Sequence, residues 1–456
     1  MTARPGSADT ALPTMTPTSP DPVAMPALPG APYFHWRDGE LWVEELPVAE
    51  LARAHGTPLF VYSASAMRDA ARAYQQALAG RDALVCYAMK ANSTLAVLEL
   101  FARAGCGFDI VSGGELERAL RAGADPQRIV FSGVGKTRAE MRRALQVGIG
   151  CFNVESLAEL DVLDAVAREL GCRAPVSLRV NPDVDAQTHP YISTGLRDNK
   201  FGIPHEQALA AYQRAATLPG LQVVGIDCHI GSQITSVAPY LDALDRVLDL
   251  VEQVEAAGIA LHHLDLGGGL GITYRDETPP AVQAWMAALL QRLDARGHGH
   301  RRLLFEPGRS LVGNAGICVT EVLYTKPGPA KSFLIVDAGM NDLPRPAMYE
   351  AYHAIVPVRP RAGTPELWDV VGPVCESGDW LGRDRALVTQ AGDWLAVASA
   401  GAYCMSMASH YNTRGKAAEV LVSGARSQLI RAREVPSDLW RQERALALDV
   451  VTSTRA

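Results

Sequence analysis

Apolar runs and amphipathic stretches alternate along residues 58–312 of the chain. In Gly113–Arg121, Leu116, Ala119 and Leu120 fall on one face at the helical period. Between such stretches lie eight short runs typical of buried parallel strands: Leu84–Ala88, Gly107–Val111, Arg128–Phe131, Gly150–Val154, Val176–Val180, Val223–Cys228, His262–Leu266 and Leu303–Phe305. The alternation predicts an α/β fold with a parallel (β/α)8 barrel of the TIM type, although a doubly wound open sheet shows the same pattern.

The pattern changes on both sides of this segment. Residues 313–456 predict a mostly β domain, because short apolar runs alternate there with Gly/Pro turns: Ile317–Leu323, Ser332–Val336, Trp368–Val371, Trp394–Ala398 and Glu419–Val422. Residues 31–57 contain a predicted hairpin over Tyr33–Leu46, with its turn at Asp38-Gly39, and we expect them to join the β domain. Residues 1–30 are rich in Pro, Ser, Thr and Ala and predict a disordered tail, in which Met25 is an alternative start.

Composition excludes several classes of function. The 456 residues are 48% hydrophobic and 20% charged, as in a globular protein of two domains. The net charge of -7, without a block of Lys or Arg, argues against a nucleic-acid or membrane surface. The eight cysteines form no CxxC pair or metal-binding spacing, which indicates reduced thiols in a cytoplasmic protein and no metal site. No apolar run approaches the ~20 residues of a membrane span.

Reactive residues follow the predicted strands. Barrel enzymes form their active sites at the carboxyl ends of the strands. The residues at those ends are Lys90, Asp109, Asn153, Arg179, His229, Gly267-Gly268-Gly269 and Glu306. The sequence therefore predicts one site at this rim.

Each of these groups has a functional and a structural interpretation. Lys90 follows an apolar strand, where burial lowers proton affinity and favours a nucleophilic amine, or it simply reaches water. The glycines 267–269 present N–H groups to a phosphate, or form a tight turn. Glu306 either keeps a pyridine nitrogen protonated or pairs with the nearby Arg309 on the surface. His229 either stacks on a cofactor ring or packs in the core.

Motifs that follow one another from about Tyr33 to Ile430 narrow the choice. They are GTPLFVYS, YAMKAN, FDIVSGGEL, HPYISTGLRDNKFGI, HIGSQ, LDLGGGLG, EPGRSLVG, DAGMNDLPRPAMYEAYH, GPVCESGD, GAYCMSMASHYNTR and AAEVLV. In this order the sequence resembles the alanine-racemase-like decarboxylases that depend on pyridoxal 5'-phosphate (PLP), in the branch that acts on diaminopimelate. The resemblance implies a PLP-binding barrel, a β domain and a homodimer with shared active sites. It also implies decarboxylation of meso-2,6-diaminopimelate to L-lysine and CO2, the last step of lysine biosynthesis.

The resemblance also implies roles for individual residues. The expected catalytic residues are Lys90, His229 and Cys375. The expected cofactor contacts are Lys90, Asp109, His229, Ser232, Gly267, Gly268, Gly269, Glu306, Pro307, Gly308, Arg309 and Tyr403. The expected substrate contacts are Arg309, Arg345, Tyr349, Glu376 and Tyr403. Cys375, the expected proton donor, and Glu376 would reach in from the partner subunit.

Other activities remain open on sequence alone. A related decarboxylase of D-lysine, D-ornithine or carboxynorspermidine is one alternative. Arg345 favours a substrate with a distal carboxylate, unless it forms a structural ion pair. An amino-acid racemase is disfavoured by Glu306, because such relatives usually set Arg against the ring nitrogen. An inactive binding homologue should have lost Lys90 or Cys375. Residues 181–200, polar with two prolines, are a candidate lid.

Overall fold

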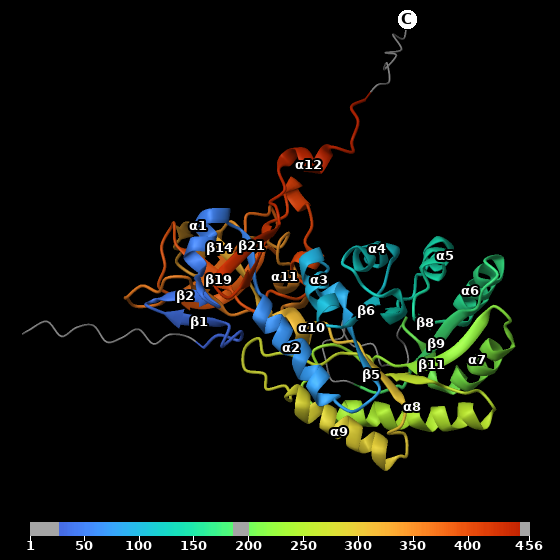
Figure 1. Cartoon of the computed structure of the whole chain (residues 1–456). Helices are drawn as coiled ribbons and strands as arrows, with labels where there is room; N and C mark the ends of the chain where they lie inside the picture. Colours follow the sequence, from blue (N-terminus) through green and yellow to red (C-terminus); the bar gives the residue numbers. More distant parts are fainter. Residues whose placement is uncertain (1–26, 186–199, 447–456) are drawn as a thin grey trace, which may run out of the picture.

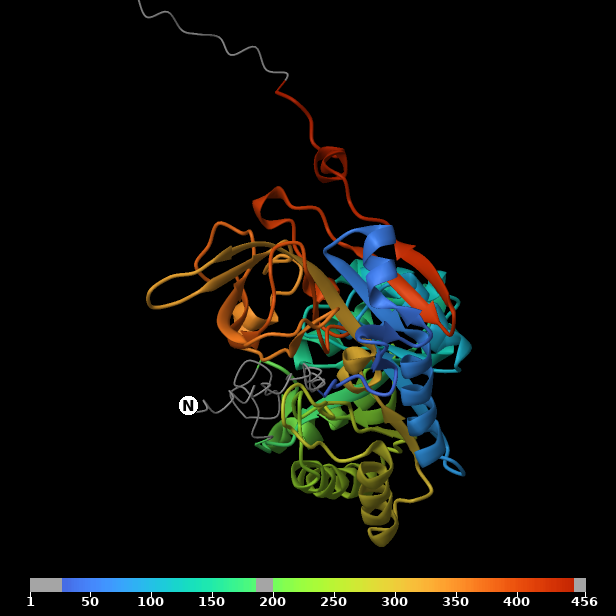
Figure 2. The same ribbon diagram turned by 90° about the vertical axis from the view of Figure 1, so that its left-hand side faces the viewer.

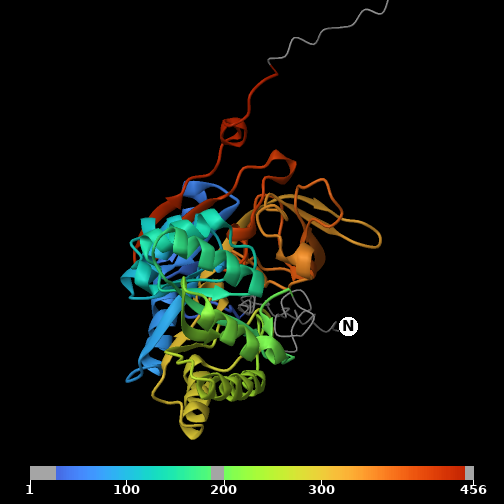
Figure 3. The same ribbon diagram turned by 90° about the vertical axis from the view of Figure 1, so that its right-hand side faces the viewer.

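The computed structural model describes residues 27–185 and 200–446 of the chain. A barrel and a β-rich domain lie side by side in all three views (Figure 1, Figure 2, Figure 3). Most of the predicted tail (residues 1–26) and of the candidate lid (residues 186–199) lies outside the described residues. None of the described helices has the length and apolar character needed to cross a membrane.

All eight predicted barrel strands are present, and they form a closed parallel barrel. Within the described residues the barrel strands are β5 (Ala83–Ala88), β6 (Gly107–Ile110), β7 (Ile129–Phe131), β8 (Cys151–Val154), β9 (Ala174–Asn181), β11 (Leu221–Asp227), β12 (His263–Asp265) and β13 (Arg302–Phe305). Pairing of β13 with β5 and of β8 with β9 closes the ring. A short strand, β10 (Ile203–Pro204), adds to β9. The closed ring excludes the doubly wound alternative.

Helices surround the barrel. They are α2 (Ala64–Ala77), α3 (Leu95–Arg103), α4 (Gly113–Arg121), α5 (Arg138–Val147), α6 (Leu157–Glu169), α7 (His205–Thr217), α8 (Ala238–Ala256) and α9 (Val282–Ala295), with a short α10 (Arg309–Val312) after the last strand. Helix α4 begins where the Ser112 hydroxyl accepts a hydrogen bond from the Glu115 backbone N–H. Its Leu116 and Ala119 are buried, as the periodicity predicts.

The second domain is built on a mixed sheet that joins distant parts of the chain. It contains β4 (Leu59–Ser63), β14 (Gly316–Lys326), β15 (Phe333–Val336), β16 (Ile355–Pro357), β17 (Glu366–Val371), β18 (Trp380–Leu387), β19 (Trp394–Val397), β20 (Ala418–Ser423) and β21 (Arg426–Arg431). All five predicted β runs are confirmed. Two short helices, α11 (Arg345–Tyr349) and α12 (Pro436–Trp440), interrupt or follow the strands.

The N-terminal segment packs on this domain. The predicted hairpin is formed by β1 (Phe34–Arg37) and β2 (Glu40–Val43), followed by β3 (Leu46–Pro47) and α1 (Val48–His55). It makes its own small sheet and buries Phe34 and Leu41 against the β domain. Strand β4 lies at the start of the predicted barrel segment, residues 58–312, but it pairs with β14 and β20 of the β domain.

Hydrogen bonds join the β domain to the barrel beside Lys90. The Tyr403 backbone N–H donates to the Ala91 carbonyl over 2.8 Å, and the Ser406 hydroxyl donates to the same oxygen over 3.0 Å. The Asn92 amide donates to the Gly401 carbonyl over 3.3 Å. The loop that carries Tyr403 is therefore fixed against the end of β5.

Candidate active site

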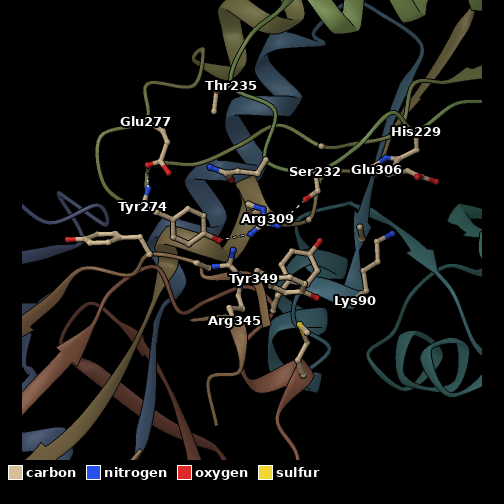
Figure 4. Close-up of a pocket in the computed structure, with 18 of the residues that line it drawn as sticks. Lys90, His229, Ser232, Thr235, Tyr274, Glu277, Glu306, Arg309, Arg345 and Tyr349 are labelled. Atoms are coloured by element: carbon tan, nitrogen blue, oxygen red, sulfur yellow. Dashed lines mark hydrogen bonds between the residues drawn. The ribbon is translucent and has the colours of Figure 1, made fainter. Parts of the chain in front are cut away.

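A cavity of about 540 Å³ lies between the strand ends of the barrel and the β domain. Its lining residues include Lys90, His229, Ser232, Gly269, Glu306, Gly308, Arg309, Arg345, Tyr349 and Tyr403, all expected from the sequence. Figure 4 shows Lys90, Glu306 and His229 at one side of this cavity and Tyr274 and Glu277 at the other. The strand ends and two segments of the second domain thus meet around a single space.

Lys90 lies in a short 3₁₀ turn (Met89–Ala91) directly after β5. Its Nζ donates to Asp109 Oδ2 over 2.6 Å. Burial alone lowers the pKa of Lys90, but the charges of Asp109 and Glu306 outweigh it and raise the pKa above its usual value. The expectation that burial lowers the proton affinity of Lys90 was therefore wrong for the cofactor-free protein. Its neighbours in sequence are apolar, but in the folded chain it lies near two carboxyl groups that are distant in sequence.

Buried carboxyl groups form a layer inside the barrel, and we call Asp109, Asp227, Asp265 and Glu306 the acid layer. Carboxyl oxygens of Asp227, Asp265 and Glu306 lie within 4.8 Å of one another. Burial, followed by the charges of Asp109, Asp265 and Asp227, raises the pKa of Glu306 well above its usual range. The Asn153 amide donates to Glu306 Oε1 over 3.2 Å, which orients this carboxyl group.

His229 and the glycine triplet pack around this acid layer. His229 Nδ1 accepts a hydrogen bond from the Gly268 backbone N–H over 3.2 Å. Burial, together with the charges of Arg179 and Lys90, lowers the pKa of His229 well below its usual value, so the ring is neutral. A Cβ atom on Gly268 would lie 2.1 Å from the Glu306 carbonyl oxygen, so only glycine allows the two strand ends to approach this closely.

Arg309 projects into the cavity and is almost fully buried. Its Nη2 donates to the Ser232 hydroxyl over 2.9 Å and its Nη1 to the Tyr274 hydroxyl over 2.6 Å. Its Cζ lies 4.7 Å from the centre of the Tyr403 ring. None of the carboxylates in the described part of the chain forms an ion pair with Arg309, so its charge is available to an anion.

Arg345, the first residue of α11, is the second buried arginine of the cavity. Its Nη1 donates to His353 Nε2 over 2.9 Å, and its Cζ lies 4.5 Å from the centre of the Tyr274 ring. Within residues 27–185 and 200–446 it too lacks a carboxylate partner. This arrangement contradicts the alternative in which Arg345 forms a structural ion pair. Tyr349, one turn further along α11, also lines the cavity.

Some expected site residues lie outside the cavity lining. Asp109, Gly267, Gly268 and Pro307 are adjacent to it and contact residues that line it; the Pro307 carbonyl, for example, accepts from the Ala88 N–H over 3.0 Å. Cys375 and Glu376 are exposed in a turn of the β domain and do not line the cavity of their own chain. The Cys375 backbone N–H donates to Asn412 Oδ1 over 2.8 Å.

Sequence reasoning missed other residues of the site. Phe201, Gln233, Thr235, Tyr274, Glu277, Tyr352 and Met407 also line the cavity. His353 contacts the cavity residues from behind. Tyr274 lies five residues after the predicted glycine turn, and His353 is the last residue of the motif DAGMNDLPRPAMYEAYH. Neither residue directly follows a predicted barrel strand, so the strand ends do not indicate them. The acid-layer residues Asp227 and Asp265 lie inside predicted strands, where the sequence pattern does not distinguish them from other strand residues.

The geometry suits PLP. A lysine amine and a buried acid line the same cavity, a neutral histidine ring stands beside them, and the buried Arg309 Nε has no hydrogen-bond partner among the described residues. Lys90, Glu306 and His229 would hold the aldehyde and ring, and Ser232, Gly269 and Tyr403 the phosphate. The fold and the site therefore define a PLP-dependent enzyme of the barrel type.

Comparisons with known proteins agree with this class. The pyridoxal-binding domain of pyridoxal-dependent decarboxylases matches residues 64–313. Diaminopimelate decarboxylase of Vibrio cholerae is 56% identical over 91% of this chain and 99% of its own length. Two crystal structures of diaminopimelate decarboxylase in complex with L-lysine match as well. The structure from M. jannaschii has 39% identity and a TM-score of 0.87, and the match covers 91% of this chain and 99% of that one. The structure from Helicobacter pylori has 42% identity and a TM-score of 0.83, and the match covers 87% of this chain and 99% of that one. The chain belongs to the pyridoxal-dependent decarboxylases, in the group named diaminopimelate decarboxylase.

Proposed function

We propose that this protein decarboxylates meso-2,6-diaminopimelate to L-lysine and CO2, with PLP as cofactor, in the last step of lysine biosynthesis. One observation carries the proposal: the cavity combines a lysine amine beside a buried acid with two buried arginines that have no carboxylate partner among residues 27–185 and 200–446. Such a cavity suits an amino acid that carries a second carboxylate. A substrate without that carboxylate would leave buried positive charge uncompensated.

The residues of the chain would divide the work. PLP, when bound, supplies an electron sink for the electrons left by the departing CO2. Lys90 provides the amine that binds the cofactor aldehyde, and Asp109 holds this amine as an ammonium in the free protein. Glu306, oriented by Asn153, would hold the cofactor ring through its nitrogen and would help to keep a proton there. Arg309 and Arg345 bind substrate carboxylate and thereby fix the orientation of the breaking bond.

We propose further that the active form is a cytoplasmic homodimer with shared active sites. Cys375 and Glu376 are exposed on the free chain, which leaves them accessible to the cavity of a second copy. Cys375 would then return a proton to the substrate carbon, and Glu376 would bind the distal ammonium. All eight cysteines are free thiols, as a cytoplasmic location would require.

The test is turnover by purified protein with added PLP. With meso-diaminopimelate we expect L-lysine and CO2, and with D-lysine, D-ornithine or carboxynorspermidine little or no CO2. Lys90→Met should abolish turnover, and peptide mapping after borohydride reduction should place the cofactor on the peptide that contains Lys90 in the wild-type protein. Preferred turnover of one of the other substrates, or racemisation without CO2, would contradict the proposal.

A further inference from the structure

Arg345 is held in the cavity by neutral groups. Buried arginines are usually paired with a carboxylate, because an isolated buried charge is costly. Here the guanidinium donates to the ring nitrogen of His353 over 2.9 Å and lies over the face of Tyr274. Among the residues that the structure describes, no carboxylate compensates it. The side chain is therefore fixed in position while its full charge remains available.

The hydrogen bonds of His353 define its tautomer. The residue is completely buried, and its Nδ1 lies 2.8 Å from the Ala398 carbonyl oxygen. A carbonyl oxygen only accepts, so Nδ1 carries the hydrogen and Nε2 is left as the acceptor for Arg345. Burial and the charge of Arg345 lower the pKa of His353 to about 3. The ring is thus neutral over the physiological range.

Tyr274 joins this arrangement to the other buried arginine. Its ring makes an edge contact with His353, with centres 5.2 Å apart, and its hydroxyl accepts from Arg309. The two arginines are therefore positioned by a tyrosine and a histidine, neither of which neutralises them. A carboxylate in the place of His353 could hold Arg345 equally well, but it would consume the charge that an incoming anion needs.

We propose that His353 is a positioning residue for substrate specificity: its neutral ring orients Arg345 and keeps the guanidinium charge free for the carboxylate of the substrate. The proposal rests on the proposed function and deepens it. It predicts that the charge of residue 353, and not only its shape, determines how tightly a carboxylate binds. Glutamine and glutamate have nearly the same shape. Glutamine keeps a donor for the Ala398 carbonyl oxygen, whereas glutamate lacks this donor and places a negative charge beside Arg345. A probe without a carboxylate separates the effect of the charge from the loss of that hydrogen bond.

The experiment compares His353→Gln with His353→Glu in the PLP-loaded enzyme by calorimetry. The probes are L-lysine and 1,5-diaminopentane, which differ by one carboxylate. His353→Gln should bind L-lysine within about threefold of the wild type, whereas His353→Glu should bind it about tenfold or more weakly. Neither variant should lose affinity for 1,5-diaminopentane. His263→Gln is the control, because His263 is a buried histidine of β12 that lies outside the cavity lining.

The outcomes distinguish this inference from the proposed function. If His353→Gln and His353→Glu bind L-lysine equally, whether as tightly as the wild type or more weakly, the role of His353 is overturned. Thermal unfolding checks that both variants are folded. Glutarate serves as a second probe that needs only the carboxylate site. Suppose that the wild-type enzyme binds glutarate but not L-lysine, and that His353→Gln binds glutarate more tightly than His353→Glu. This result would contradict the proposed substrate and would still support the role of His353.

Discussion

Replacement of Lys90 by methionine tests whether this amine is the counter-charge of the acid layer. Methionine keeps an unbranched stem and removes the ammonium that lies 2.6 Å from Asp109. Loss of one partner of a buried ion pair typically costs about 3–5 kcal/mol, because the other charge stays buried without compensation. The Lys90 side chain is 39% exposed, so solvent screens part of the interaction, and we expect a loss of about 2 kcal/mol near neutral pH.

This loss should depend on pH. Lys90 lowers the pKa of Glu306, against burial and the other carboxylates, which raise it. Without Lys90 the pKa of Glu306 in the folded state rises further above its unfolded value, so the folded variant favours the protonated acid. Such a group stabilises the fold below its unfolded pKa, and this stability is lost as the pH rises through the folded pKa. The difference between wild type and variant should therefore widen as the pH rises.

Urea unfolding of the cofactor-free protein at about pH 5 and about pH 8 measures both effects. The control is Lys331→Met, because Lys331 pairs with Asp369 over 2.8 Å with its side chain 56% exposed. That variant should lose less than about 1 kcal/mol at either pH. A Lys90→Met protein as stable as the wild type, or with the same deficit at both pH values, would refute the assignment of Lys90 as the counter-charge.

Three further predictions follow from the site and its surroundings. Tyr274→Phe removes the acceptor of a 2.6 Å hydrogen bond from a buried arginine and should raise KM about tenfold or more in steady-state turnover; an unchanged KM would contradict its role. Burial raises the pKa of Asp342 from 3.8 to about 6, so the ionised carboxylate destabilises the folded protein at high pH. In urea unfolding, Asp342→Asn should therefore be more stable than the wild type by up to about 3 kcal/mol at high pH, with no gain below the pKa of the unfolded state. A variant less stable than the wild type at high pH would contradict this prediction. Mixed Lys90→Met and Cys375→Ala subunits should recover about a quarter of the wild-type turnover if sites are shared in a dimer, and no recovery would argue against shared sites.

The sequence predicted the barrel because its strands are local apolar runs, and it predicted the rim because residues after parallel strands meet at one edge. The pairing of β4 with β14 and β20 depends on partners more than 250 residues away, which no local pattern reports. The prediction of a neutral Lys90 amine was wrong for the same reason, because Asp109 and Glu306 are distant in sequence and approach Lys90 only in the folded barrel. His353 reaches the site only because the second domain folds back onto the strand ends.

The distribution of charge across the cavity gives a physical reason for the orientation of the substrate. Closed barrel strands exclude water from the acid layer, so the carboxyl groups there attract cations and retain protons. Helix α10, which follows β13, and the second domain place Arg309 and Arg345 in the same cavity, without carboxylate partners in the described part of the chain. Diaminopimelate carries an amine and a carboxylate at each end, so this polarity matches an amine of the reacting end placed toward Lys90 and a carboxylate placed toward the arginines.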